Sequence, residues 1–405
     1  NETAKILTKN PKDNQNKTLV DEPKQKFKEI SSLMSQVNYV RASQEIFSLI
    51  KSPKMAPYGT QLRYWLGVSL LKMKLHQTAA FQFVHVVKSN SSQYLKPALE
   101  KLSMIADYLG DETLLNYAIN KVEVEDFPKT AKDVLLYRLG EIKSKNGEFA
   151  EAIDAFSKVD LKSRYYDQAR FKLGIVHLES KHPLEAIKLY SEMLESKSKF
   201  SVINRTRVAI IMALARSYYQ AQKWDDSIEY YRQIPRDTDF WHDAIFEMSW
   251  ADLRAARFRS ALSNFQTLHS TYYEDSYFPE SLLLRGIVYL YICKYDEMEK
   301  VLDLFEKNYG QIRNTIDQQL KEVKDPFFFY NEIEKIDQAR KNASKKIQTK
   351  IPFSVGKKLL KEGDVSKMVQ YLKLVSQERG RVEKPNFART GLGQYSLKII
   401  NNRIK

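Results

Sequence analysis

The 405-residue sequence is short of several residue types, and each shortage narrows the range of folds. It has 13 glycines and 12 prolines, too few for a β-rich or loop-rich protein, and this composition favours helices. Its single cysteine, Cys293, excludes a framework of internal disulfides. Its longest apolar run, residues 208–215, falls far short of the ~18 residues that a membrane-spanning helix needs. The composition therefore predicts an all-α protein with an apolar core.

Motifs of catalysis are also missing from the sequence. It contains no HExxH, CxxC, GxSxG or phosphate-binding loop, and its six histidines are scattered, at positions 76, 85, 177, 182, 242 and 269. Cys293 lies on a predicted helix with no histidine nearby, so we expect a buried structural thiol rather than a nucleophile. We therefore predict that the protein is not an enzyme and uses no metal or cofactor.

What the sequence does contain is a repeat with a period of 34 residues. Gly140 recurs at this distance as Gly174, and Ala152 recurs as Ala186. The same order of small, small and large residues continues in both directions along the chain. About eight units result, and they start near residues 23, 60, 99, 133, 167, 208, 242 and 279.

This pattern resembles that of the tetratricopeptide repeat (TPR) family, in which W-x2-L-G-x2-Y is followed by A-x3-F and a proline. The best copies are Leu139-Gly140 with Ala152-x3-Phe156, and Leu173-Gly174 with Ala186-x3-Tyr190. The resemblance covers residues 23–312, although the third copy has Val122 at the large position and most copies lack the proline. It implies pairs of antiparallel helices that stack into a right-handed superhelical solenoid with a concave groove.

The small and large residues have a packing role in such a repeat. A small residue in the first helix lets the second helix approach closely, and an alanine in the second helix does the same in return. The aromatic residue four positions later fills the gap on the same face. We therefore expect Gly147, Ala152 and Phe156, like the equivalent small and large residues of the other copies, to be structural, and the function to lie on the groove side of the first helices.

The resemblance places the groove residues at the second, fifth, ninth, twelfth and thirteenth positions of each first helix. The lysine and asparagine clamp with which some family members capture a free carboxylate is missing. The positions instead carry mostly apolar side chains with arginines among them, namely Tyr137, Phe171, Ile175, Met212, Arg216, Phe246, Trp250 and Arg254. Such a surface favours docking of a partner's amphipathic helix or hydrophobic peptide. The alternative is that the chain's own segment 326–350, with its FFFY sequence, covers the groove.

The net charge of +15 is concentrated at one end of the chain. Residues 341–405 contain 16 Lys and Arg against four Asp and Glu, a net charge of +12. We expect a disordered lead at 1–22, the TPR solenoid at 23–312 and a basic helical C-terminal region at 313–405. The basic region offers candidate anion-binding residues, or else a solvated basic face; the candidates are Lys345, Lys346, Lys357, Lys358, Lys361, Arg379 and Arg381.

Two features favour an envelope location. Segments 232–251 and 272–286 resemble junctions in TPR proteins of predatory and gliding bacteria, which are associated with the cell envelope. The chain starts at Asn1 and not at Met, which fits the removal of a signal peptide. We expect a periplasmic or envelope-associated protein, with a cytoplasmic location left open.

These features together predict a non-enzymatic scaffold or adaptor that docks one or more partner proteins in its groove, within a bacterial envelope complex. The alternative is a module that binds an anion or acidic polymer, such as peptidoglycan, the lipid head groups of an anionic membrane or nucleic acid, through the basic C-terminal region. Nucleic acid is disfavoured, because the sequence has no recognition motif and no basic stripe interleaved with aromatic residues. An enzyme built on helical repeats would need paired carboxylates in a cleft, and the sequence offers no convincing pair.

Overall fold

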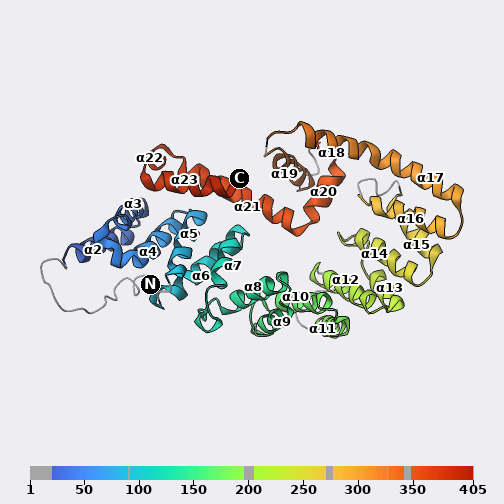
Figure 1. Cartoon of the computed structure of the whole chain (residues 1–405), viewed down its shortest axis with the longest axis horizontal. Coiled ribbons are helices and arrows are strands. Elements are labelled where there is room, and N and C mark those ends of the chain that lie inside the picture. The colour runs from blue at the N-terminus through green and yellow to red at the C-terminus, as the bar shows by residue number, and fades with distance from the viewer. Residues whose placement is uncertain are drawn as a thin grey trace. The chain divides into compact units, whose positions relative to one another are not determined.

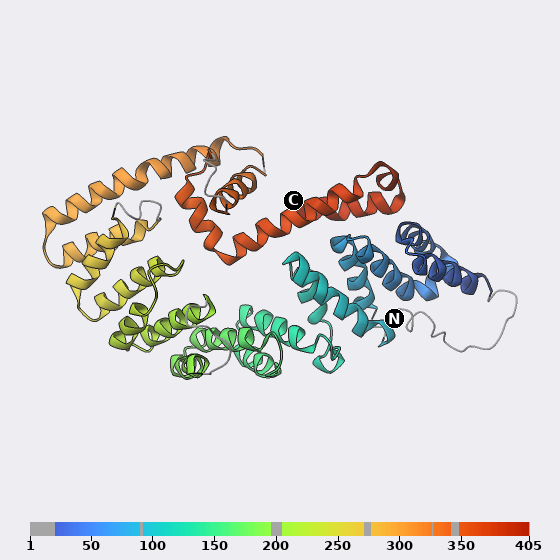
Figure 2. The same cartoon turned by 180° about the vertical axis from the view of Figure 1, so that it is seen from behind.

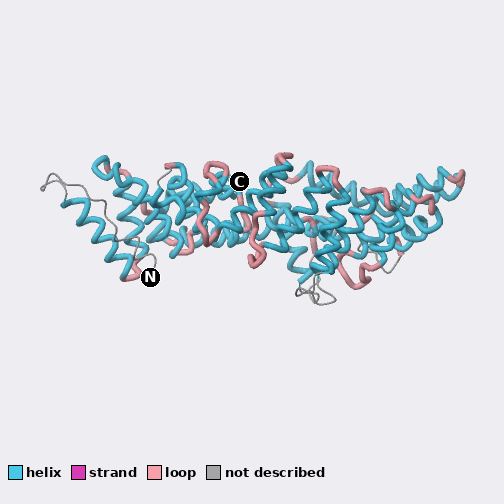
Figure 3. The backbone as a smooth tube through the Cα atoms, turned by 90° about the horizontal axis from the view of Figure 1, so that it is seen from below, coloured by secondary structure: helices cyan, strands magenta, loops and turns pink. Residues whose placement is uncertain are grey.

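The chain forms two compact units of helices (Figure 1). The terminal unit consists of Asn1–Leu135 with Gln370–Lys405, and the central unit of Leu136–Val369. The computed structural model describes residues 21–89, 92–195, 205–270, 277–325, 327–341 and 348–404. Within these ranges every regular element is helical and no strand occurs (Figure 3). Residues 1–20 of the predicted lead lie outside the described residues.

Eight helix pairs follow one another through the described residues. The terminal unit contains α2 (Asp21–Ser35) with α3 (Tyr39–Ile50), α4 (Gly59–Lys72) with α5 (His76–Lys88), and α6 (Ser92–Leu109) with α7 (Thr113–Ile119). Then come α8 (Lys132–Lys145) with α9 (Phe149–Ser157), α10 (Tyr166–Glu179) with α11 (Pro183–Glu195), α12 (Arg205–Gln220) with α13 (Trp224–Arg232), α14 (Trp241–Arg254) with α15 (Phe258–Leu268), and α16 (Pro279–Tyr291) with α17 (Tyr295–Phe305). The pairs begin close to the positions that the 34-residue period predicts, so the all-α repeat fold is confirmed.

Further helices follow the eighth pair. A π-helical segment, η4 (Glu306–Gly310), joins α17 to α18 (Gln311–Glu322), and α19 (Phe328–Lys341) and α20 (Phe353–Lys361) come next in the central unit. α21 (Gly363–Val382) continues into the residues of the terminal unit, which also contains α22 (Pro385–Ala388) and α23 (Gly391–Ile404). The residues of the predicted region 313–405 are therefore divided between the two units.

Close contact within a pair depends on the predicted glycines. A Cβ atom added at Gly140 would lie 2.7 Å from the Phe156 ring, and one added at Gly174 would lie even closer to the Tyr190 ring. Carbon atoms in favourable contact are ~3.5–4.0 Å apart, so a side chain at either position would have to displace the ring. Ala186 is fully buried in the same pair. The predicted structural role of these residues is confirmed.

The turn inside each pair contains one residue in the left-handed backbone region. Gly110 and Gly147 have φ angles of 68° and 78°, which glycine adopts without strain. The other turns place a side chain in this region, at Val37, Lys74, Lys181, Gln222, Ala256 and Cys293. Cys293 is exposed in its turn, so the expectation of a buried thiol was wrong. The reason is that α16 ends at Tyr291, two residues before the cysteine.

In the terminal unit, the C-terminal helices pack against the N-terminal pairs. α23 contacts α3 and α5, beside which it lies in both Figure 1 and Figure 2. The Glu378 carboxylate, on α21, accepts hydrogen bonds from the backbone N–H groups of Gln77 and Thr78, at 2.9 and 3.1 Å. N–H groups in the first turn of a helix have no partner within the helix. Glu378 therefore supplies the missing hydrogen-bond acceptor at the N-terminus of α5. Glu378 and Gln77 are 301 residues apart in the sequence.

A pair of glycine substitutions tests the contact within the repeats. We expect Gly174→Ala to lower the free energy of unfolding by about 2 kcal/mol, because the added methyl group must displace the Tyr190 ring. Gly286→Ala is the matched control, since an added Cβ there meets nothing closer than Leu302, at 3.9 Å. Helix propensity predicts a gain of about 0.5–1 kcal/mol for this control. Unfolding in denaturant measures both changes, and equal losses would exclude the ring contact as the cause.

The stability of the terminal unit should depend on pH through Glu378. Its side chain is 1% exposed, and burial raises its pKa to about 7, against the opposing effects of the hydrogen bonds from Gln77 and Thr78 and of the nearby Arg381. A carboxyl group whose pKa is raised on folding binds its proton more tightly in the folded chain. Its contribution to stability is therefore complete below its ordinary pKa and is lost as the pH rises through about 7.

We expect the free energy of unfolding to fall by about 2 kcal/mol more between pH 5 and pH 8 in the natural chain than in Glu378→Gln. The glutamine keeps the size of the side chain and cannot titrate, so the comparison cancels the other titrating groups. Unfolding in denaturant at the two pH values provides the measurement. The same pH dependence in both proteins would show that Glu378 is not responsible.

Candidate functional site

The structure divides the predicted groove residues by their exposure to solvent. Met212, on α12, is 2% exposed and belongs to one apolar cluster with Ala244 and Met248 of the next pair. It is therefore a core residue, and its prediction as a contact for a partner is corrected. Tyr137, on α8, is 7% exposed and stacks on Tyr165, with 5.7 Å between ring centroids. Neighbouring residues cover these side chains to a degree that the repeat position alone does not reveal.

The other predicted residues are open to solvent to different degrees. Phe171 and Ile175, on α10, and Phe246, on α14, are half-buried. Trp250 is 37% exposed, and Arg216 and Arg254 are exposed as well. These six side chains are the more exposed part of the predicted set.

A first hollow, of about 540 Å³, opens beside α10 and α12. Tyr137, Phe171 and Phe240 give it aromatic walls. Its remaining lining residues are mostly polar, namely Arg164, Asp167, Gln168, Lys172, Met193, Arg205, Thr206 and Ala209. The aromatic walls can hold an apolar side chain of a ligand. The charged and polar residues around them can bind the polar groups next to that side chain.

A second hollow, of about 410 Å³, lies between α14, the start of α16 and α20. The repeats contribute apolar residues and three carboxylates to it, namely Phe246, Tyr277, Phe278, Pro279, Asp243, Glu247 and Glu280. α20 contributes Val355, Lys358 and Leu359, and Glu362 follows directly after the helix. The second hollow thus combines aromatic surface with negative charge.

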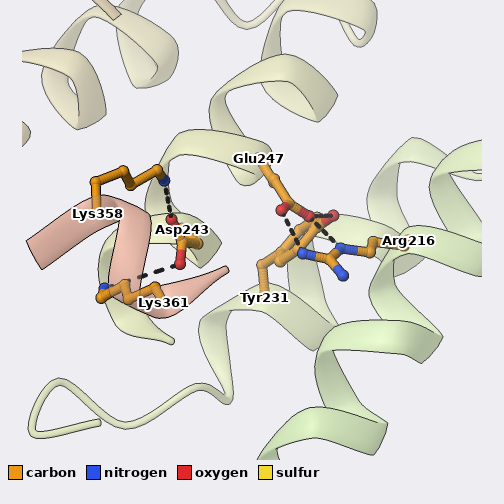
Figure 4. A network of polar contacts seen from close by, with 6 residues as sticks. All are labelled: Arg216, Tyr231, Asp243, Glu247, Lys358 and Lys361. Carbon is orange, nitrogen blue, oxygen red and sulfur yellow. Dashed lines mark hydrogen bonds and ion pairs between the residues drawn. The ribbon is translucent and has the colours of Figure 1, made fainter. Parts of the chain in front are cut away.

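The contacts of α20 bring a late segment of the chain onto the groove (Figure 4). The Lys358 Nζ atom lies 3.1 Å from the Asp243 carboxylate and 4.6 Å from the centroid of the Phe278 ring. Lys361 donates a hydrogen bond of 3.0 Å to the backbone carbonyl of Asp239. A segment of the chain does approach the groove, as the alternative expectation held, but these contacts come from residues 353–361 and not from 326–350.

An ion pair joins two successive repeats next to this contact (Figure 4). The Arg216 guanidinium, on α12, donates two hydrogen bonds to the Glu247 carboxylate, on α14, at 2.7 and 2.6 Å. Tyr231, on α13, donates a third hydrogen bond to Glu247, at 2.9 Å. The bond to Glu247 raises the pKa of Arg216 further, and burial together with Glu247 raises the pKa of Tyr231. Arg216 is therefore charged and Tyr231 is a neutral donor throughout the physiological range.

The first helix of the eighth pair, α16, exposes a stripe of large apolar side chains. Leu283, Ile287, Leu290 and Tyr291 are 43%, 50%, 49% and 78% exposed. Their spacing of four, seven and eight residues from Leu283 puts them on one face of the helix. Leu283 and Ile287 occupy the fifth and ninth repeat positions, so the repeat pattern places both on the groove side of α16. We call these four residues the α16 stripe.

Four of the predicted anion-binding residues have partners within the chain. Lys345 and Lys346 lie outside the described residues. Lys357, Lys358 and Lys361 belong to the central unit, where Lys358 and Lys361 have the partners given above. Arg379 and Arg381 belong to the terminal unit, where they pair with Glu383, at 2.7 Å, and with the backbone carbonyl of Lys74, at 3.2 Å.

Within the described ranges, no three His, Cys, Asp or Glu side chains are grouped so that they could hold a metal ion. None of the described helices is both long and apolar enough to cross a membrane.

The Arg216–Glu247 pair should couple the sixth and seventh repeats. Because the Arg216 side chain is 52% exposed, we expect Arg216→Met to cost only about 1 kcal/mol of unfolding free energy. Glu247→Gln should cost less unfolding free energy in the Arg216→Met chain than in the natural chain. The difference is the coupling energy of a double-mutant cycle, and we expect about 0.5–1 kcal/mol. Arg254→Met, an exposed arginine of α14, serves as the control and should show no coupling to Glu247→Gln. A coupling energy of zero for Arg216 would contradict the assignment.

Comparison with known proteins gives one family match. Residues 211–237 match the family model described as tetratricopeptide repeat, and this segment runs from the middle of α12 through α13. The curated proteins include no match to the chain.

Several solved structures resemble the chain weakly. MamA is 16% identical over 44% of this chain and 97% of its own, with a TM-score of 0.36. PilF of Pseudomonas aeruginosa is 15% identical over 53% of this chain and 95% of its own, with a TM-score of 0.34. RapI in its apo form is 11% identical over 85% of this chain and 95% of its own, with a TM-score of 0.43. The family match therefore identifies a tetratricopeptide repeat at residues 211–237, and the helix pairs on either side of it have the same architecture.

Proposed function

We propose that the chain is a non-enzymatic scaffold that holds a helix or peptide of a partner protein on the groove side of its central unit. The observation that carries this proposal is the α16 stripe. Four large apolar side chains on one helical face are exposed to water there, and such a surface is typical of an interaction site. Proteins with tetratricopeptide-like repeats usually mediate protein–protein interaction, which agrees with this use of the surface.

The α16 stripe starts at the second hollow. Glu280 lines the hollow, and Leu283 and Ile287 follow it by three and seven residues along the same face of α16. From Leu283 to Tyr291 the stripe spans about 12 Å, at 1.5 Å per residue, which is about two turns of a helix. A partner's amphipathic helix laid along α16 would cover the stripe and place its end at the carboxylates of the hollow.

Binding of an anion or acidic polymer through the basic C-terminal region is the weaker candidate. Lys358, Lys361, Arg379 and Arg381 each have a partner within the chain, so an anion would have to compete for them. We keep the groove as the site of function for that reason. The location in a bacterial envelope complex stays a prediction from the sequence.

Substitution of Ile287 tests the groove. The partner is first isolated with the natural chain as bait and then purified, so that calorimetry measures binding between two defined proteins. We expect Ile287→Asp to weaken binding more than tenfold, because the partner's apolar face would have to bury an unpaired carboxylate. Leu184→Asp, at a leucine of α11 that is 62% exposed, should bind as the natural chain does.

Thermal unfolding of both variants checks that they are folded. If Ile287→Asp and Trp250→Ala both keep the natural affinity, the groove is not the docking surface and the proposal is wrong.

A further inference from the structure

The two faces of α20 have different neighbours. Gly356 packs so closely on α19 that an added Cβ would collide with Ile336, and Leu360, one turn later, is buried too. The other face lines the second hollow, with Val355, Lys358 and Leu359 at the spacing of one helical side. One face of α20 therefore packs on α19. The opposite face is amphipathic, carries Lys358 and lies toward the groove.

The contact of α20 with the repeats is polar and incomplete. Lys358 meets Asp243 in an ion pair whose side chains are 39% and 26% exposed, and such pairs contribute little to stability. Lys361 adds one hydrogen bond to the backbone carbonyl of Asp239 and a second, longer ion pair to Asp243, at 4.0 Å (Figure 4). The hollow of about 410 Å³ remains between this face of α20 and the apolar residues Phe246 and Phe278. A helix held in this way can be exchanged for another one.

The chemistry of the second hollow specifies what could take the place of α20. Without α20, its described lining residues bring the carboxylates of Asp243, Glu247 and Glu280 and no lysine or arginine. Glu247 is paired with Arg216, whereas Asp243 loses both of its lysine partners, Lys358 and Lys361, when α20 leaves. A replacement must therefore bring positive charge to Asp243 and apolar side chains to the aromatic wall.

We infer, on the basis of the proposed function, that the partner segment is a basic amphipathic helix and that α20 occupies its place in the unbound chain. A lysine or arginine of the partner takes the Asp243 contact, and the apolar side of its helix covers Phe246, Phe278 and then the α16 stripe. Displacement of α20 precedes or accompanies binding. The strength of the α20 contact therefore sets the apparent affinity for the partner.

A labelled synthetic peptide with the sequence of residues 351–363 serves as the probe, and fluorescence anisotropy measures its binding to the full chain. Lys358→Glu in the chain loosens α20, so the fraction of chains with an open hollow rises and the affinity for the peptide should increase about tenfold. Lys373→Glu is the matched control, because it reverses an exposed lysine of α21 that belongs to the terminal unit. It should leave the affinity unchanged.

An exchange of charges tests the contact itself. Asp243→Lys should abolish binding of the natural peptide, because like charges then meet in the hollow. A peptide that carries Lys358→Glu and Lys361→Glu should bind the Asp243→Lys chain and not the natural one. Recovery of binding by the exchanged pair supports the inference, and loss of binding in every combination overturns it.

These outcomes are separate from the test of the proposed function. If Lys358→Glu binds the peptide no better than the natural chain, or if Asp243→Lys still binds it, the inference of a basic helix that competes with α20 is wrong. Ile287→Asp can still abolish binding of the purified partner in that case, and the groove then remains the docking surface. If Ile287→Asp and Trp250→Ala both leave the partner's affinity unchanged, the proposed function itself fails.

Discussion

The close approach of two helices at a small residue is the constraint on which the rest of the structure depends. Phe156 and Tyr190 fill the space over Gly140 and Gly174, so in these two pairs the second helix packs almost directly on the backbone of the first. This contact uses one side of the first helix and fixes its orientation. Groove residues at the fifth position take part in the same packing, since the Tyr137 and Phe171 rings lie 5.8 and 5.6 Å from the Phe156 and Tyr190 rings. At the ninth position, Trp250 and Ile287 are exposed, so residues there can differ between repeats without loss of the fold.

The groove positions differ because each one also depends on the next pair. Met212 and Leu283 both occupy the fifth position of a first helix, yet Met212 is 2% exposed and Leu283 is 43% exposed. Met212 is covered because Ala244 and Met248 of the following pair join its apolar cluster. The repeat pattern states which way a side chain points from its own helix. It does not state how closely the neighbouring helix approaches.

The same distinction explains which features the sequence predicts. The helix pairs, their starting positions and the role of Gly174 follow from contacts within one 34-residue unit, and the pattern of small and large residues records such contacts directly. The contact of Glu378 with Gln77 joins residues 301 positions apart, and that of Lys358 with Asp243 joins residues 115 positions apart. Neither leaves a periodic signal, because each occurs once. Arg216 was predicted without Glu247 for a related reason, since the pattern identifies positions on a face but not the pairs that form across it.

The contacts of Glu378 and Lys358, which the C-terminal helices make with the repeats, differ in the free energy that it costs to break them. Glu378 is 1% exposed and is held by two backbone N–H groups at the start of α5, so its removal would leave buried donors without a partner. Lys358 is 39% exposed, and water can replace each of its interactions when it leaves Asp243. The contact of Glu378 therefore belongs to the permanent structure of the terminal unit. The contact of Lys358 has the low cost of opening that a competing ligand requires, and for this reason we assign regulation to α20 and not to the helices that follow it.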